Sequence, residues 1–293
     1  MSVEKVELGR ALFFDPRLSV SGEYACATCH RPELAYTDGR AQAVGVRGAL
    51  TRHSAMSLTN VAYNPAFSWT DARVHSLEVQ MRQPLFNEHP LEIGLLGREA
   101  RVIAMLGADV KYRALFEASF PAAAPISIKN IIKAIAAFER TLISGRAAFD
   151  RYVFDDDRAA LSLAAKQGMA LFYSSRVGCA RCHFGLNFSG PIAYAARPVA
   201  RAIYANTALY CREQHGICPG KFRVPTLRNI ALTAPYMHDG SLASLDQVID
   251  HYAQGGWQGS AARQLRPFSL SVAEKYALIE FLKSLTDAEF ARR

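Results

Sequence analysis

The pattern Cys-x-x-Cys-His occurs twice in this chain and constrains it more than any other feature of its 293 residues. It stands at Cys26–His30 and again at Cys179–His183. A chain of this composition would contain the pattern by chance roughly 0.003 times, so two copies are not accidental. Two thiols one helical turn apart can bond the two vinyl groups of a haem, and the histidine that follows can coordinate its iron. The pattern therefore predicts two covalently attached c-type haems.

A zinc ribbon and a redox dithiol also contain Cys-x-x-Cys pairs, but both fit this chain less well. The cysteine pairs of a zinc ribbon are usually closer in the sequence, and neither kind of site requires a histidine after each pair. The haem assignment gives each motif residue a role. The predicted thioether residues are Cys26, Cys29, Cys179 and Cys182, and the predicted proximal iron ligands are His30 and His183.

The remaining two cysteines, Cys211 and Cys218, lie in a stretch that contains Gly and Pro. Haem of the c type is attached outside the bacterial inner membrane, where thiols oxidise, so we expect a local disulfide between them. The alternative is a metal site that also uses His215. The same argument predicts a periplasmic protein, and because Met1 is not followed by an apolar segment, we expect that an export signal has been removed.

The charge and hydropathy of the chain exclude two classes of partner. The longest apolar stretches, such as Ile131–Phe138 with Lys133 inside it, are far shorter than a membrane span. The net charge is +8, but the 34 Lys and Arg residues are scattered among acidic ones and form no basic tract. We therefore predict neither a membrane span nor nucleic-acid binding.

Helical periodicity dominates the chain and predicts an all-α fold. Ser271 with Glu274 forms a capping box, and Ser127 can cap the helix that follows it. The predicted helices are 72–82, 127–142, 159–173, 245–254 and 271–285. The polar segment 145–157 is predicted to be a linker between two haem domains, at residues 1–145 and 158–293.

Two further segments resemble the bacterial dihaem cytochrome c peroxidase/MauG superfamily. The run Leu8–Ser19 leads into the first haem motif, and Phe222–Gly240 follows the second, as they do in that family. The resemblance covers nearly the whole chain. It implies two tandem cytochrome c-like domains whose haems face a shared interface.

Within the superfamily, the stretch Arg82–Gly94 together with Arg52-His-Ser is most similar to the MbnH branch. These MauG-like dihaem enzymes are associated with bacterial copper homeostasis and act on a tryptophan of a partner protein, MbnP. The resemblance therefore implies a copper-associated, MbnP-like partner protein.

The resemblance also implies a sixth ligand for the second haem. In the family this ligand is a methionine in typical peroxidases and a tyrosine in MauG, at a fixed spacing after the glycine that corresponds to Gly240. Counting that spacing from Gly240 without a gap reaches Tyr252. A phenolate stabilises ferric and higher iron, whereas a thioether raises the reduction potential. Met237 is the main rival, His238 and His251 are further ones, and Tyr252 can also be a packed helix aromatic.

The first haem is expected to have an open face. Typical peroxidases carry a removable second histidine in the loop that corresponds to residues 41–50, and this loop contains none before His53. We therefore predict a five-coordinate haem that reacts with hydrogen peroxide without prior reduction.

Matching the family's distal pocket assigns Gln80 and Pro84 to that open face. The distal glutamate corresponds to Glu92 after a two-residue insertion, with Glu88 as the alternative. Such a carboxylate can move a proton between the two oxygens of peroxide. An isolated glutamate is otherwise usually a solvated surface residue.

The family's inter-haem tryptophan corresponds to Trp69, which is one position out of register and can also be an interface core residue. The family's calcium site between the domains corresponds to the carbonyl oxygens of Thr233 and Pro235. His53 stands where the family has a side-chain asparagine, so one oxygen donor is missing.

Three functions follow from these predictions. The first is a MauG/MbnH-like enzyme that uses hydrogen peroxide to form a high-valent, bis-Fe(IV)-type state and oxidises an aromatic residue, tryptophan in the branch it resembles, on a partner protein. The second is a cytochrome c peroxidase that reduces peroxide to water with electrons from a small cytochrome or copper protein. The third is a non-enzymatic dihaem electron carrier, which would require both axial positions of each haem to be filled.

Overall fold

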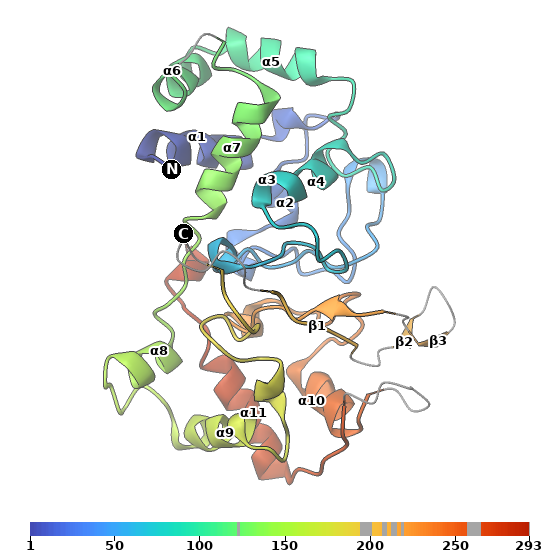
Figure 1. Ribbon diagram of the computed structural model, residues 1–293, viewed down its shortest axis with the longest axis vertical. Coiled ribbons are helices and arrows are strands. Elements are labelled where there is room, and N and C mark those ends of the chain that lie inside the picture. The colour runs from blue at the N-terminus through green and yellow to red at the C-terminus, as the bar shows by residue number, and fades with distance from the viewer. Residues whose placement is uncertain are drawn as a thin grey trace.

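The computed structural model describes residues 1–121, 124–193, 201–206, 210–211, 216–217, 220–256 and 265–292. The chain forms two halves stacked along the long axis of the molecule, the N-terminal half above and the C-terminal half below in Figure 1. The fold is mostly helical, as predicted. The α-helices are α1 (Val3–Phe13), α2 (Cys26–Cys29), α3 (Leu77–Gln80), α4 (Arg82–Phe86), α5 (Glu99–Ala108), α6 (Val110–Ser119), α7 (Ile128–Glu139), α8 (Ala148–Phe154), α9 (Leu163–Tyr173), α10 (Leu245–Ala253) and α11 (Val272–Lys283).

Strands contribute little to the described part of the chain. Two antiparallel pairs of two residues each are present: β1 (Tyr204–Ala205) with β4 (Phe222–Arg223), and β2 (Tyr210–Cys211) with β3 (Gly216–Ile217). No helix among the described residues is both long and apolar enough to cross a membrane.

Hydrogen bonds at helix N-termini explain which predicted helix boundaries are right. Ser127 accepts a bond from the amide of Asn130, and Ser271 forms the predicted capping box with Glu274. The predicted starts at residues 72 and 159 are wrong. The helices begin after Ser76 and Ser162 instead, because the hydroxyls of these serines accept bonds from the first-turn amides.

The core of the N-terminal half is built where α1 crosses α7 (Figure 1). Gly9 permits this crossing, because a Cβ atom at Gly9 would lie 1.9 Å from the carbonyl oxygen of Ala134. Around the crossing pack Leu8, Leu12, Phe13, Ile135 and Phe138, all of them buried.

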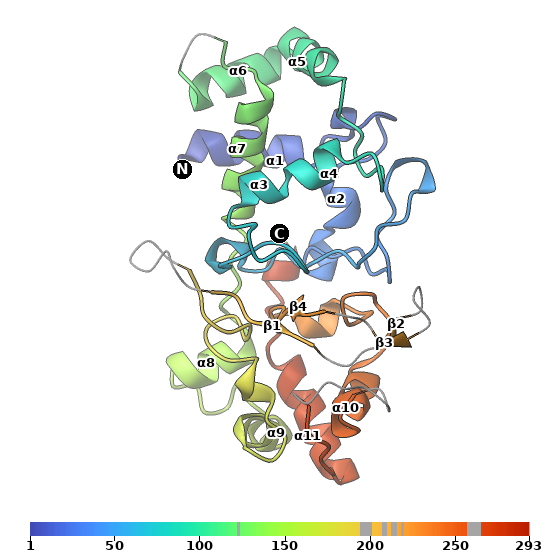
Figure 2. The same ribbon diagram turned by 45° about the vertical axis from the view of Figure 1, so that its right-hand side comes forward.

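The C-terminal half repeats this arrangement where α9 crosses α11, at the bottom of Figure 2. A Cβ atom at Gly168 would lie 1.9 Å from the carbonyl oxygen of Ala277. The same close helix crossing is thus present once in each half. Phe172, Phe188 and Phe281 fill the second core around it.

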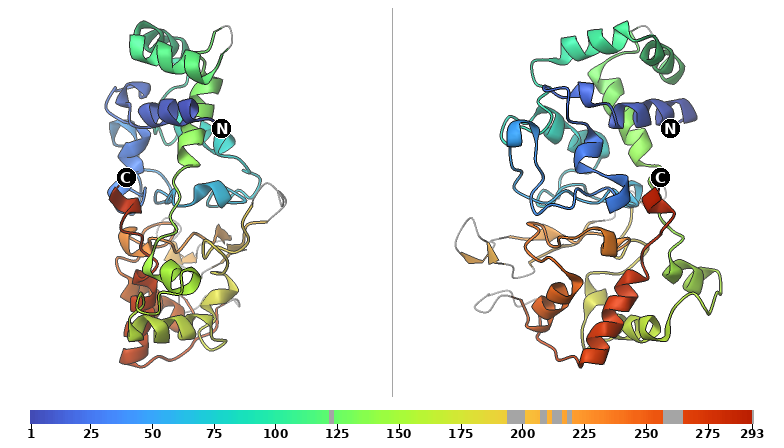
Figure 3. Two further views of the ribbon diagram at one scale, coloured as in Figure 1. Left: turned by 90° about the vertical axis from the view of Figure 1, so that its left-hand side faces the viewer. Right: turned by 180° about the vertical axis from the view of Figure 1, so that it is seen from behind.

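The predicted linker is more structured than its polar composition suggests. Residues 148–154 form α8, and Phe149 packs into the second core, with its ring centroid 5.1 Å from that of Phe188. The C-terminus turns back to the N-terminal half, as the view from behind in Figure 3 shows, and places Phe290 in the first core. The ring centroid of Phe290 lies 5.6 Å from that of Tyr36. The core of each half therefore contains a residue from outside its predicted domain boundaries, Phe290 in the first core and Phe149 in the second.

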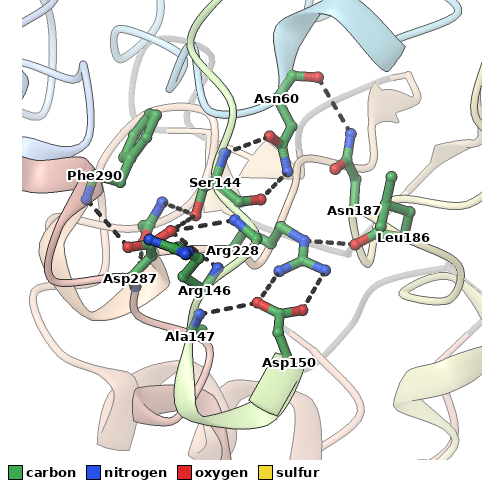
Figure 4. A network of polar contacts seen from close by, with 12 residues as sticks. Asn60, Ser144, Arg146, Ala147, Asp150, Leu186, Asn187, Arg228, Asp287 and Phe290 are labelled. Carbon is green, nitrogen blue, oxygen red and sulfur yellow. Dashed lines mark hydrogen bonds and ion pairs between the residues drawn. The ribbon is translucent and has the colours of Figure 1, made fainter. Parts of the chain in front are cut away.

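A buried polar network joins the halves where the chain passes between them (Figure 4). Asn60 donates to the carbonyl of Ser144 (2.8 Å) and accepts from its amide (2.7 Å). Asp287, near the C-terminus, accepts from the Ser144 hydroxyl and from the amides of Gly145 and Arg146. These bonds fix the crossover segment against both halves, because buried backbone groups need partners.

Beside this network lies a buried ion pair between Arg228 and Asp150 of α8 (Figure 4), with two nitrogen–oxygen distances of 2.9 Å. The two side chains are 1% and 5% exposed. The Asp150 carboxylate also accepts a bond from the amide of Ala147. This pair anchors α8, and with it the start of the C-terminal half, to the segment that follows the second haem motif.

Replacing Asp150 with asparagine leaves the guanidinium of Arg228 buried without its counter-charge. We expect the free energy of unfolding to fall by about 3–5 kcal/mol. Asp156→Asn is the matched control, because its partner Arg158 is exposed and such pairs contribute about 0–1 kcal/mol. Denaturant unfolding of both variants measures the difference, and equal losses would show that the buried pair is not special.

Candidate functional site

The first Cys-x-x-Cys pair occupies the single turn of α2, which places both thiols on the wall of one cavity. This cavity has a volume of about 520 Å³ and is lined by Cys26, Cys29 and His30, among others. The hydroxyl of Thr28, inside the motif, accepts a bond from the Ala25 amide (3.0 Å) and closes the turn. Cys26 and Cys29 are not joined in a disulfide.

The histidine of the first motif is oriented by a backbone carbonyl. His30 Nδ1 lies 2.9 Å from the carbonyl oxygen of Tyr36, so Nδ1 carries the proton and Nε2 is left to coordinate a metal. Burial lowers the pKa of His30, which favours the neutral, metal-binding imidazole.

The second motif has the same histidine–carbonyl hydrogen bond as the first, but its cysteines lie in a 3₁₀ turn and not in an α-helical one. Cys179–Arg181 forms a short 3₁₀ turn after Gly178, whose φ of 67° is in the left-handed region. His183 Nδ1 lies 2.7 Å from the carbonyl oxygen of Phe188, and burial lowers the pKa of His183 too. Both motifs thus present two unpaired thiols and one oriented, neutral imidazole.

These features fit covalently held haems. Ligand cavities typically measure about 300–1,000 Å³, so the first cavity has room for a large cofactor. Among the described residues, no three His, Cys, Asp or Glu side chains come together as a metal cage, so nothing there resembles the zinc alternative. The fold and the two motifs define a dihaem protein of the c type.

The predicted distal residues Gln80, Pro84 and Glu92 all line the first cavity. The loop around Gly45 positions Glu92, because a Cβ atom at Gly45 would lie 2.2 Å from the carbonyl oxygen of Leu91. The amide of Val46 also donates to the carbonyl of Glu92 (3.0 Å). Burial raises the pKa of the Glu92 carboxyl to about 7.

The structure separates Glu92 from its alternative Glu88. Glu88 is exposed and does not line the cavity. Its backbone nevertheless pairs in an antiparallel β-bridge with Leu91, the residue directly before Glu92. The fold of this loop places Glu92 at the cavity and Glu88 at the surface, which alignment with the family motif alone does not decide.

Trp69 lies between the two halves and lines the first cavity as well as a smaller one at the interface. Its Nε1 donates to the carbonyl of Ser54 (3.0 Å), and its own carbonyl accepts from the amide of Arg223 in the C-terminal half (2.8 Å). His53 lies nearby, lining the first cavity with its ring centroid 5.7 Å from that of Phe222.

Tyr252, on the last turn of α10, is the candidate sixth ligand that the structure brings to the second motif. Burial raises the pKa of its phenol, and the nearby thiols of Cys179 and Cys182 raise it further. Tyr252 is therefore the ligand candidate whose phenol interacts electrostatically with both thiols of the second motif.

The rivals of Tyr252 lie elsewhere or beside it. Met237 lines the small interface cavity together with Trp69. His238 is buried in a stack on Phe222, with a centroid distance of 3.5 Å. The ring centroid of His251 is 5.5 Å from that of Tyr252.

The predicted calcium donors Thr233 and Pro235 line the small interface cavity of about 70 Å³. Asp38 lines it too, and its Oδ2 atom is buried without a hydrogen-bond partner. This carboxylate is an oxygen donor that the sequence comparison with the family did not reveal. Calcium prefers oxygen ligands, so the residues present suit the ion even though His53 replaces the asparagine.

Two buried charged residues in the first cavity were missed from the sequence. Glu139 ends α7, is 7% exposed, and its Oε2 has no hydrogen-bond partner. Burial raises the pKa of Glu139 to about 8. The second is Arg223, which is 5% exposed. In the sequence, Glu139 is an acidic residue at the end of an otherwise apolar helical segment. This pattern alone does not distinguish a surface residue from a residue that lines a cavity.

The predicted disulfide between Cys211 and Cys218, the alternative site with His215, and the second tryptophan Trp257 lie outside the residues whose side chains the structure describes.

Comparison with known proteins gives the family. Residues 3–158 match the family described as di-haem cytochrome c peroxidase. The chain is 37% identical to the methylamine utilization protein MauG of Methylorubrum extorquens, over 97% of this chain and 79% of that protein. It is 33% identical to the cytochrome c551 peroxidase of Pseudomonas aeruginosa, over 85% of this chain and 71% of that protein.

Among solved structures, a MauG-like protein associated with microbial copper homeostasis superposes with a TM-score of 0.90 and 37% sequence identity. The superposition covers 99% of this chain and 91% of the other. The chain belongs to the di-haem cytochrome c peroxidase/MauG family. It is a haem-dependent oxidoreductase with two c-type haems and a peroxidase-type function.

Proposed function

We propose that this protein is a periplasmic MauG/MbnH-like enzyme. It uses hydrogen peroxide to oxidise an aromatic residue, tryptophan in particular, on a partner protein by long-range electron transfer. The observation that carries the proposal is that the phenol of Tyr252, on α10, interacts electrostatically with the thiols of the second motif, while Met237 lines the interface cavity. A hard oxygen ligand stabilises oxidised iron, which suits an enzyme that stores oxidising equivalents.

In this proposal each half is a cytochrome c-like haem domain, residues 1–145 and 158–293. The repeated helix crossings at Gly9 and Gly168 support two equivalent domains. His30 and His183 would each coordinate one iron, and Tyr252 would be a further ligand of the second. The haems, when bound, supply the redox chemistry with peroxide.

The side chains of the first cavity manage protons. The Glu92 carboxylate would take the proton from one peroxide oxygen and return it to the other, while the haem would supply the two electrons needed to release that oxygen as water. Gln80 would donate a hydrogen bond to peroxide, and Pro84 would limit the space beside it. Trp69 links the two haem sites across the interface, and an aromatic ring at that position shortens the path for electrons.

Two supporting features complete the site. A calcium ion held by the carbonyls of Thr233 and Pro235 and by Asp38 would fix the interface around Trp69. The proposed partner is an MbnP-like, copper-associated protein, as the resemblance to the MbnH branch implies. The similarity to a MauG-like protein associated with microbial copper homeostasis supports this part of the proposal.

The second candidate function is a cytochrome c peroxidase that reduces peroxide to water with electrons from a small cytochrome or copper protein. The identity of 33% to the cytochrome c551 peroxidase favours it. The predicted electron carrier without enzyme activity is not supported, because the relatives are peroxidases and MauG proteins.

Adding one equivalent of hydrogen peroxide to the diferric protein, and then a tryptophan-containing partner, separates the two functions. We expect the optical and EPR spectra to change and then return, while mass spectrometry finds added oxygen on the partner. Omitting peroxide is the control. If instead the spectra return only when a reduced cytochrome is supplied and the partner stays unmodified, the protein is a cytochrome c peroxidase.

Replacing Glu92 with glutamine removes the proton-transferring carboxylate. We expect the rate of reaction with peroxide to fall roughly 100- to 10,000-fold. Because a base must be ionised and the pKa of Glu92 is about 7, the wild-type rate should rise as the pH increases through 7, and the variant should lose this rise. Glu88→Gln is the matched control, and an equal effect there would refute the assignment of Glu92. Stopped-flow spectroscopy gives the rates.

Replacing Tyr252 with phenylalanine removes the proposed oxygen ligand. We expect the optical and EPR signals of the second haem to change and those of the first to persist, because only one coordination sphere is altered. Met237→Leu is the comparison, since this variant should leave both sets of signals unchanged. A spectrum that responds to Met237→Leu and not to Tyr252→Phe would assign the ligand to the thioether.

A further inference from the structure

Arg223 is a buried cation that forms no ion pair with any residue that the structure describes. It ends β4 in the C-terminal half, is 5% exposed, and lines both the first haem cavity and the small interface cavity. Its Nη2 donates to the thioether sulfur of Met56 (3.0 Å), and its Nε has no partner. No carboxylate of the described residues lies within ion-pair distance of it, in contrast to Arg228 with its 2.9 Å pair to Asp150.

An arrangement of this kind is unfavourable for the chain alone. A buried guanidinium that lacks an anion destabilises the folded chain, and a thioether is only a weak acceptor. Burial lowers the pKa of Arg223 to about 10, so the group remains charged at neutral pH. Backbone bonds hold it in place, because its amide donates to the carbonyl of Trp69 in the other half.

The cavity wall does not supply the missing anion. Glu92, Glu139 and Asp71 line the first cavity, and Asp38 lines the interface cavity, but none of them forms an ion pair with Arg223. Burial raises the pKa of both glutamates, Asp71 pairs with Arg73, and Asp38 lies in the proposed calcium site. The group attached at Cys26 and Cys29 brings two carboxylates of its own, the haem propionates.

We infer that Arg223 binds a propionate carboxylate of the first haem, across the interface between the halves. The inference rests on the dihaem assignment and is independent of the proposed oxidation of a partner. It makes the first haem a part of the interface: the thioethers and His30 hold it to the N-terminal half, and Arg223 holds it to the C-terminal half. The backbone bond from Arg223 to Trp69 places this contact beside the proposed path between the haems.

A positive charge beside a propionate affects the reduction potential of that haem. Removing it favours the ferric form, so we expect Arg223→Gln to lower the potential of the first haem and to change that of the second less. Arg223→Lys, which keeps the charge, should restore most of the wild-type value. Arg52→Gln is the matched control, because Arg52 lines the same cavity but is exposed.

The experiment is spectroelectrochemical titration of the four holoproteins, with infrared spectra of protein whose haem propionates carry ¹³C. The propionate carboxylate bands should shift in Arg223→Gln and not in Arg52→Gln. Equal effects of Arg223→Gln and Arg52→Gln, or unshifted propionate bands, would overturn the inference. A wild-type potential that follows the concentration of added formate would assign the site to a free carboxylate instead.

A crystal structure of the wild-type holoprotein tests the same contact without relying on the folding of any variant. We expect a guanidinium nitrogen of Arg223 within ion-pair distance of a propionate oxygen. Water or a buffer anion at Arg223, with both propionates elsewhere, would contradict the inference.

Discussion

The orientation of two imidazoles by two backbone carbonyls is the interaction on which the rest of this structure depends. The Nδ1 atom of His30 hydrogen-bonds to the carbonyl oxygen of Tyr36, and that of His183 to the carbonyl oxygen of Phe188. A thiol pair can attach a haem in any pose that the linking bonds allow, but the Nδ1 hydrogen bond fixes the tautomer and the direction in which Nε2 points. Tyr36 and Phe188 are themselves buried in the two cores, so the packing of each half sets the position of its iron.

The two halves share this histidine geometry but differ in the side chains of the helix that follows the 3₁₀ turn. Asn60 and Asn229 both adopt left-handed backbone conformations, with φ of 54° and 60°, and both precede a 3₁₀ turn. In each half the next helix begins with a serine cap, at Ser76 for α3 and at Ser244 for α10. The helix that follows the cap carries Gln80 in the first half and Tyr252 in the second. In the proposed function, this helix would present an amide to the first haem and a phenol to the second, and that difference would help to separate a site open to peroxide from a site with a filled sixth position.

The sequence was sufficient for features that are local and insufficient for those that depend on contacts between distant segments. The haem motifs, the capped helices α7, α10 and α11, and the cavity position of Glu92 follow from spacing, periodicity and family resemblance. The packing of Phe149 and Phe290 into the cores could not be foreseen, because short aromatic segments near chain crossings carry no periodicity. Glu139 and Arg223 could not be recognised either, since a charged residue in sequence is most often solvated and only the assembled cavity shows that these two are buried.

The electrostatics of the first cavity connect these observations. Its two glutamates are pushed towards the neutral form by burial, with pKa values of about 7 for Glu92 and about 8 for Glu139. Arg223 stays charged near neutral pH, and the two glutamates compensate its charge only in part. A haem brings anionic propionates to such a site and lowers the cost of burying the arginine, whereas a site built for an electrically neutral cofactor would gain nothing from it. The same cavity then contains Glu92, whose carboxyl can both accept and donate a proton near neutral pH because its pKa is about 7. The burial that makes these groups costly for folding is also what gives them pKa values suited to catalysis near neutral pH.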